Sequence, residues 1–252
     1  KRFYVSTPIP DELPGLPDAL RNLVRPYIHE SVAFTARKVE GEIPVGASRV
    51  GGAPDLPPGT AWPQWLFRGD QLENWPEWAQ RELDEYRAKG FVKESVGADG
   101  VKTVELPLPF VAQIDLTELR SVTGGSLRKL LPTNGWLYFF ADPATTIGEV
   151  DGRPYVASAV LYLSGERTTS DVLVRTPPPA MPAESQIAPA ALSFSLAREL
   201  PEPAMLPDQI TSGLDRNAYN ALEEAARGTA PASPYHAVGA LPYASEIGGD
   251  PG

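Results

Sequence analysis

The chain has 252 residues, 42% of them hydrophobic, which is enough to bury a core as one large domain or two small ones. It contains no cysteine, and this excludes disulfides, thiol catalysis and thiolate metal sites. Its formal net charge of -10 and its scattered Lys and Arg residues argue against binding to the phosphate backbone of nucleic acids.

The sequence shows no signal for membrane insertion or export. No apolar run reaches the roughly 18 residues that cross a bilayer. The first residues, KRFYVSTPIPDELPG, have a basic pair but neither a continuous apolar stretch nor a small-residue cleavage site. We therefore expect a cytoplasmic protein that does not bind membranes. Because the first residue is Lys, we also expect the natural N-terminus to lie upstream.

The N-terminal part predicts one helix and one strand. Residues 17 to 30 have the pattern of a helix that is capped at Asp18 and bent or ended early by Pro26. Residues 31 to 39 alternate as in a strand whose sheet has one wetter face.

A proline-rich stretch follows at residues 47 to 65, ASRVGGAPDLPPGTAWPQW. Gly51 and Gly52 allow unusual backbone angles, so we expect a stiff surface or cross-over loop. Trp62 and Trp65 either line a groove that receives a partner or plug the edge of a core. The glycine pair lacks the Gly-Lys-Ser/Thr of a phosphate-binding loop.

The clearest amphipathic helix is predicted over residues 74 to 90, where Asn74 caps the start and Gly90 ends it. A glycine-bearing turn at 96 to 100 follows, and residues 101 to 106 pair back as a hairpin strand. Residues 74 to 100 are therefore a candidate helical insertion.

The central stretch, residues 104 to 142, contains two predicted core strands and the helix that joins them. The strands cover 110 to 114 and 136 to 140, two apolar runs bounded by polar or turn residues. Asp115 or Thr117 caps a short helix at 116 to 120, and Gly124-Gly125 ends it.

The C-terminal part adds strands at 155 to 163, 171 to 175 and 191 to 196, and a helix within 207 to 227. The proline-rich run at 176 to 192 predicts a surface crossing between sheet halves. With about seven strands and three or four helices, the class is α+β.

The chain resembles the YwqG-like family, a bacterial domain whose function is not established. The resemblance rests on SRVGGAPDLPPGTAWP, LPFVAQIDLTEL, LPTNGWLYFFAD and HAVGALPYASEIGGDP, which occur in the family's order. It implies one α+β domain over residues 1 to 252, with mixed or antiparallel sheets in two related halves. It also implies that the strand pair following the last motif is missing here. Related domains are associated with toxin-immunity neighbourhoods.

Three polar residues in the central stretch are candidates for chemistry. Asp115 and Asp142 follow neighbouring strands, so their carboxylates can converge near Gln113 for acid/base work or a hard metal. The alternative is that Asp115 caps the helix and Asp142 begins an Asp-Pro turn. Gln113 either binds a peptide or ligand, or satisfies the chain's own loop.

Two functions from different classes remain. The first is a non-enzymatic protein-binding module, of the immunity type, that binds a basic partner such as a toxin through its acidic surface or through Trp62 and Trp65. The second is a hydrolase or metal-dependent enzyme centred on Gln113, Asp115 and Asp142. The binding module is favoured, and we predict neither a cofactor nor a structural metal.

Overall fold

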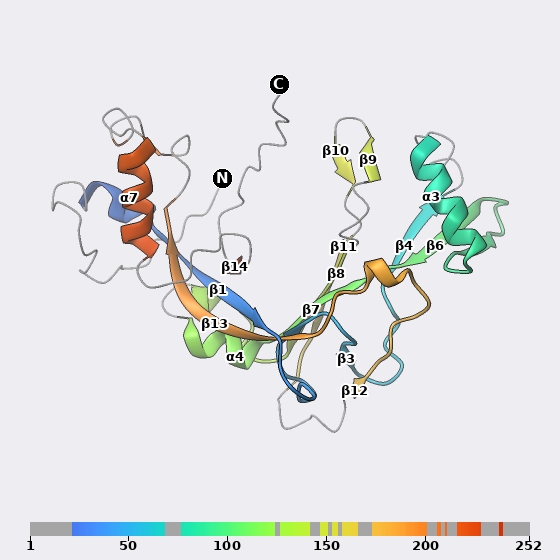
Figure 1. Cartoon of the computed structure of the whole chain (residues 1–252), viewed down its shortest axis with the longest axis horizontal. Coiled ribbons are helices and arrows are strands. Elements are labelled where there is room, and N and C mark those ends of the chain that lie inside the picture. The colour runs from blue at the N-terminus through green and yellow to red at the C-terminus, as the bar shows by residue number, and fades with distance from the viewer. Residues whose placement is uncertain are drawn as a thin grey trace. The chain divides into compact units, whose positions relative to one another are not determined.

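The structure is a computed structural model of the chain, and its contacts divide it into two compact units. Unit 1 comprises residues 1–35, 118–133 and 193–252, and unit 2 comprises residues 36–117 and 134–192 (Figure 1). The structure describes residues 22–68, 77–123, 127–141, 147–150, 153–155, 158–165, 173–200, 206–207, 210, 216–227 and 237–238.

Unit 2 is built on antiparallel strands in the order β11-β8-β7-β2. These strands are β2 (Arg49–Val50), β7 (Phe110–Asp115), β8 (Trp136–Ala141) and β11 (Ser158–Leu163). Ala190 and Ala191, at the start of β13 (Ala190–Glu199), pair with β2. The two long apolar runs of the central stretch thus lie side by side, as the sequence predicts.

Alternating side chains give this sheet an inner and an outer face. The inner face carries the apolar core of unit 2, because every second residue of β8 is buried there. The core consists of Leu56, Leu108, Phe110, Trp136, Tyr138, Phe140 and Leu173. On the outer face, the alternate residues of β8, Leu137 and Phe139, are only half-buried.

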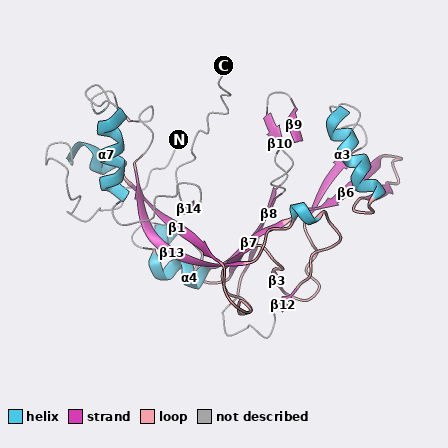
Figure 2. Ribbon diagram, viewed as in Figure 1, coloured by secondary structure: helices cyan, strands magenta, loops and turns pink. Residues whose placement is uncertain are grey.

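A second, three-stranded sheet in unit 2 has the order β4-β6-β5. It packs against one helix, which is labelled α3 beside β6 in Figure 2. The strands are β4 (Gln64–Arg68), β5 (Lys93–Val96) and β6 (Lys102–Pro107), and the helix is α3 (Glu77–Ala88). Leu83 of α3 is buried against Phe67 and Val104. The amphipathic helix predicted in this region therefore packs its apolar side against this small sheet.

Two strand pairs complete unit 2. The hairpin of β9 (Ile147–Val150) and β10 (Arg153–Tyr155) is antiparallel. The other pair joins β3 (Asp55–Leu56) to β12 (Val174–Arg175), far apart in the sequence. A short 3₁₀ helix, η3 (Ala183–Ser185), lies in the proline-rich run.

Unit 1 contains residues 29–35 of β1 (His29–Arg37). This strand begins after the 3₁₀ helix η1 (Arg25–Tyr27) and pairs with β14 (Ala237–Val238). Its long helix is α7 (Arg216–Arg227), whose Leu222 is buried. The core of unit 1 consists of Val24, Ile28, Leu200, Leu206, Ile210 and Leu222.

A short helical pair joins β7 to β8. It consists of α4 (Leu116–Val122) and α5 (Leu127–Leu130). The Arg120 side chain donates hydrogen bonds to the carbonyls of Arg128 (2.6 Å) and Leu131 (2.8 Å) at the end of α5. These carbonyls have no partner inside the helix, so the guanidinium acts as its C-terminal cap.

Two sequence predictions need correction. The helix predicted over 17 to 30 does not extend to residue 30, because Pro26 falls in η1 and β1 already begins at His29. The stretch 47 to 65 is no simple surface loop, since it contains β2 and β3 and its Arg49 and Asp55 are buried. Short paired strands leave no hydrophobic period from which to predict them.

The class is α+β, with antiparallel sheets and short helices, as the sequence predicts. No helix in the part of the chain that the structure describes is long and apolar enough to cross a membrane.

Candidate functional site

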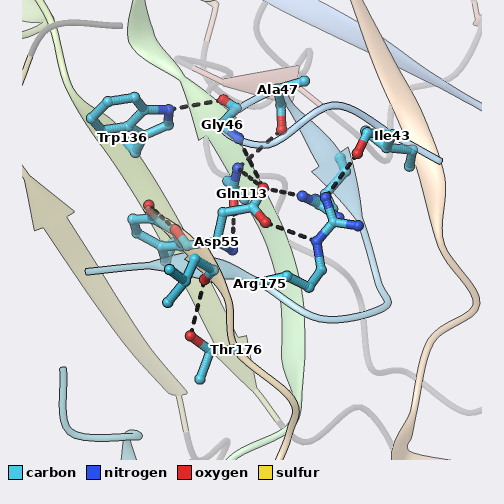
Figure 3. Close-up of polar contacts among 11 residues, drawn as sticks. Ile43, Gly46, Ala47, Asp55, Gln113, Trp136, Arg175 and Thr176 are labelled. Carbon is cyan, nitrogen blue, oxygen red and sulfur yellow. Dashed lines mark hydrogen bonds and ion pairs between the residues drawn. The ribbon is translucent and has the colours of Figure 1, made fainter. Parts of the chain in front are cut away.

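Asp55 is the centre of a buried polar cluster in unit 2 (Figure 3). Its carboxylate is fully buried and accepts hydrogen bonds at both oxygens. Oδ2 receives the Gly46 N–H at 2.9 Å and the Gln113 amide at 3.2 Å, and Oδ1 receives Arg175 Nε at 2.8 Å. The short strand β3 holds this carboxylate in place by pairing with β12, which also supplies Arg175.

Two arginines share the Asp55 carboxylate. Arg49 is 1% exposed and donates from Nη2 to Oδ2, whereas the Arg175 side chain is 34% exposed. Arg175 Nη2 also donates to the carbonyl of Ile43 at 2.7 Å. Within the described residues, Arg49 Nε has no hydrogen-bond partner. A buried carboxylate needs such partners, since losing them leaves an uncompensated charge.

The Gln113 side chain ties this cluster to the central strand β7. Its Oε1 accepts the Asp55 N–H at 2.8 Å, and its Nε2 donates to the Ala47 carbonyl at 3.0 Å and to Asp55 Oδ2. The amide is fully buried, and these bonds use its oxygen and both of its N–H groups. Its hydrogen bonds thus hold the chain's own residues 47 to 55.

Aromatic residues of β8 complete the cluster. The Tyr138 hydroxyl donates to the Asp55 carbonyl at 2.6 Å, and the Trp136 indole N–H donates to the Gly46 carbonyl at 2.8 Å. Both rings lie in the core of unit 2. Trp136 and Tyr138 therefore connect the polar cluster directly to the apolar core.

The ionisation of the cluster follows from its burial and its charges. Burial raises the pKa of the Asp55 carboxyl, but the hydrogen bonds from Arg175, Gly46 and Gln113 and the charge of Arg49 outweigh burial, so this pKa lies below its usual value. Burial lowers the pKa of Arg49 and raises that of Tyr138. Asp55 is consequently ionised and Tyr138 neutral at pH 7.

The backbone beside β2 makes an unusually close approach. Gly51 has a φ of 62° and donates its N–H to the Val111 carbonyl at 2.8 Å. A Cβ on Gly51 would lie against the Ile187 carbonyl and 2.6 Å from the Ala188 oxygen. Only glycine fits here, which explains the first glycine of the Gly51-Gly52 pair.

The residues proposed for an acid/base or metal site have these positions. Asp115 is buried, and its Oδ1 caps α4 by accepting the Thr117 N–H at 2.7 Å. Ser48 Oγ accepts the Asp115 N–H at 2.9 Å. Asp142 lies outside the described residues. The side chains that the structure describes contain no group of three or more His, Asp or Glu placed to hold a metal.

Trp62 and Trp65 both pack against the chain's own core. The Trp62 ring meets Phe140 edge to face with centroids 5.3 Å apart, and its N–H donates to the Leu108 carbonyl at 2.8 Å. Trp65 belongs to β4 and lies against Phe67, with centroids 4.1 Å apart. Both side chains are half-buried.

Arg49, Asp55 and Arg175 were not among the predicted site residues. Arg49 and Asp55 stand in a glycine- and proline-rich stretch that reads as a loop, and Arg175 follows 120 residues after Asp55. The one feature of the sequence that could have pointed to this cluster is charge. Arg49 and Asp55 flank Gly51-Gly52 inside a run of otherwise small or apolar residues.

A different feature, strand β11, presents an apolar surface to solvent. Among the strands that the structure describes, it is the end strand of its sheet, and it contains no charged residue. Val160 is 58% exposed and Tyr162 is 45% exposed, and they lie opposite the half-buried Phe139 and Leu137 of β8. We call this strand, with the outward-facing Val160 and Tyr162, the β11 edge.

The edge strand β5 has the opposite character. Lys93 and Glu94 make ion pairs there, Lys93 with Glu105 at 3.3 Å and Glu94 with Lys102 at 2.9 Å. Charged side chains on an edge strand oppose pairing with other chains. The molecule thus protects the β5 edge with charge and leaves the β11 edge apolar.

Comparison with known families decides the relationship of the chain. Residues 48–249 match the family described as a domain of unknown function, DUF1963. The chain belongs to the DUF1963 family. The DUF1963 match begins at Ser48 and so includes Arg49, Asp55, Gln113 and Arg175, the whole side-chain cluster. No curated protein matched the chain.

Proposed function

We propose that this DUF1963 protein is a non-enzymatic binding module that receives a strand of a partner protein at the β11 edge. The observation that supports it is an end strand without charge, on which Val160 and Tyr162 are 58% and 45% exposed. A strand added there gains backbone hydrogen bonds, and alternate side chains of the partner pack on the outer face.

The polar cluster supports a binding role more than an enzymatic one. Gln113 uses its hydrogen-bonding groups on residues 47 to 55, and Asp115 caps α4. A reacting group needs access to its substrate, and both side chains are almost fully buried. Their described contacts are those of residues that hold the sheet together.

The charge of the chain indicates the chemistry of the partner. The net charge is -10, and Asp142, Glu149, Asp151, Glu166 and Asp171 outnumber the basic residues in the sequence on either side of β11. We propose a partner whose apolar strand is flanked by basic residues. Because the YwqG-like resemblance has toxin-immunity associations, we propose that this partner is a basic toxin and that the chain is its immunity protein.

The test compares two substitutions that each replace an exposed valine of an edge strand by lysine. Val160→Lys places a charge on the β11 edge, and Val96→Lys, at a position 69% exposed on β5, is its matched control. The wild type and both variants are used as baits to capture proteins from the source organism, and thermal melts confirm that both variants fold. We expect one protein to bind the wild type and Val96→Lys but not Val160→Lys.

Hydrogen exchange on the reconstituted pair then locates the contact. Every second amide of residues 158 to 163 points away from β8, because β11 pairs antiparallel with that strand. These amides should become protected when the captured protein binds, because strand addition gives them new acceptors. Retention of the same protein by Val160→Lys, or unchanged exchange across β11, would refute the proposal.

A further inference from the structure

We infer that, without its partner, the β11 edge of this protein is occupied by the β11 edge of a second copy, in an antiparallel pair centred on Leu161. This inference rests on the proposed function, because it assigns a resting occupant to the same edge. The occupied dimer and the partner complex exclude each other.

The chemistry of the strand is compatible with itself. Residues 158 to 163 read Ser-Ala-Val-Leu-Tyr-Leu, so two copies bring no charge against a like charge along the strand. A dimer made by twofold rotation uses the same patch on both copies. The β5 edge would fail this test, since it carries Lys93 and Glu94.

The faces of the sheet restrict the register. Directly opposite residues of an antiparallel pair project to the same face, and a slip of one residue moves every side chain to the other face. Val160 and Tyr162 face outward, whereas Leu161 packs against the core of unit 2. Keeping the two outer faces together therefore requires a residue, and not a peptide bond, at the centre, and Val160, Leu161 and Tyr162 are the centres that bring the exposed side chains into the pair.

Among these centres, Leu161 pairs the apolar residues best. It places Val160 opposite Tyr162 of the second copy at two symmetric positions, and it places Leu161 opposite itself. Pairs of an aromatic with a β-branched residue are among the favourable cross-strand pairs. A centre at Val160 would set Tyr162 opposite Ser158, and a centre at Tyr162 would leave half of the strand unpaired.

The charge of the chain makes the two occupants respond oppositely to salt. Two copies each carry -10, so salt screens their repulsion and strengthens the dimer. A basic partner is attracted by the same charge, so salt weakens the complex. One strand pair is also a small contact compared with the about 1,600 Å² of a typical stable interface, which predicts dimerisation only at high protein concentration.

The absence of cysteine permits a direct test of the register by disulfide formation. Opposite residues have Cα atoms about 4.5 to 5.5 Å apart, within the range for a disulfide, whereas diagonal neighbours lie about 7 to 8 Å apart. Leu161→Cys should cross-link to itself under mild oxidation. Val160→Cys alone should not, but a mixture of Val160→Cys and Tyr162→Cys chains should form mixed dimers.

Sedimentation across protein and salt concentrations provides the second readout. We expect a monomer–dimer equilibrium that moves toward dimer between about 0.05 and 0.5 M salt, that Val160→Lys abolishes and that Val96→Lys leaves unchanged. A monomer at every concentration, or self-cross-linking of Val160→Cys as fast as that of Leu161→Cys, would overturn the inference. The mixed-chain experiment keeps the test valid if Leu161→Cys does not fold. Partner capture that persists without any dimer would overturn this inference alone and leave the proposed function standing.

Discussion

Gln113 on β7 hydrogen-bonds to Asp55 through both the backbone and the side chain of that residue, 58 positions earlier in the sequence. Its Oε1 accepts the Asp55 N–H at 2.8 Å while its Nε2 donates to the Asp55 carboxylate at 3.2 Å. One buried amide thus fixes both the position of β3 and the orientation of its carboxylate.

Removing this amide should destabilise the fold. We expect Gln113→Ala to lower the free energy of unfolding by about 1 to 3 kcal/mol, because buried hydrogen-bonding groups lose their partner. Urea unfolding measures the change. Gln64→Ala is the control, since Gln64 is exposed and makes one 3.3 Å bond to the Trp62 carbonyl. Equal stability of the two variants would show that the Gln113 bonds contribute little.

Replacing different members of the ion cluster should lower the stability of the fold by different amounts. Asp55→Ala leaves Arg49 buried without its carboxylate, so we expect a loss of about 3 to 5 kcal/mol. Arg175→Ala should cost less, because that side chain is 34% exposed and Arg49 still pairs with Asp55. Chemical denaturation of both variants gives the ranking, and a larger loss for Arg175→Ala would contradict it.

The lowered pKa of Asp55 predicts an acid dependence of stability. A carboxyl whose folded pKa is depressed stabilises the fold above its unfolded pKa, about 3.9, and this contribution is lost as the pH falls through the folded pKa. The difference in stability between the wild type and Asp55→Asn should be constant above about pH 5 and shrink below about pH 4. Urea unfolding at a series of pH values measures it, and a difference that grows on acidification would show the opposite sign.

Gly51→Ala should be far more damaging than an alanine at another glycine of positive φ. Gly51 and Gly59 have φ values of 62° and 81°, but only at Gly51 would a Cβ meet the backbone, at Ile187 and Ala188. Gly59→Ala should cost about 1 to 2 kcal/mol for its backbone conformation. Gly51→Ala should lose about 1 to 3 kcal/mol more, the usual range for overpacking. Thermal melts compare the two variants, and similar melting temperatures would mean that the 187–188 backbone moves away at little cost.

The central stretch was predictable because its apolar runs are bounded by polar or turn residues. The strands at 110 to 114 and 136 to 140 became β7 and β8, each longer by one residue, and Asp115 caps the helix that follows. Short-range patterning and capping chemistry both act within a few residues, so the sequence displays them directly.

The cluster around Asp55 could not be predicted in the same way. Arg49, Asp55 and Arg175 meet only because β3 pairs with β12, and these strands have two residues each, too few for a hydrophobic period. Strand β4 was missed because it begins at Gln64, within the proline-rich run where a loop was expected. Long-range pairing of short strands leaves its mark on tertiary contacts and not on local sequence.

The pairing of β3 with β12 also sets an order for folding. Arg49 and Asp55 are made early in synthesis, but Arg175 and the Val174–Leu56 backbone pair arrive about 120 residues later. Contacts of such sequence separation form slowly, because a long loop must close first. Until residue 175 has left the ribosome, the Asp55 carboxylate lacks one of its two arginine partners. In a chain whose synthesis stops before that point, Arg49 alone neutralises the charge of Asp55.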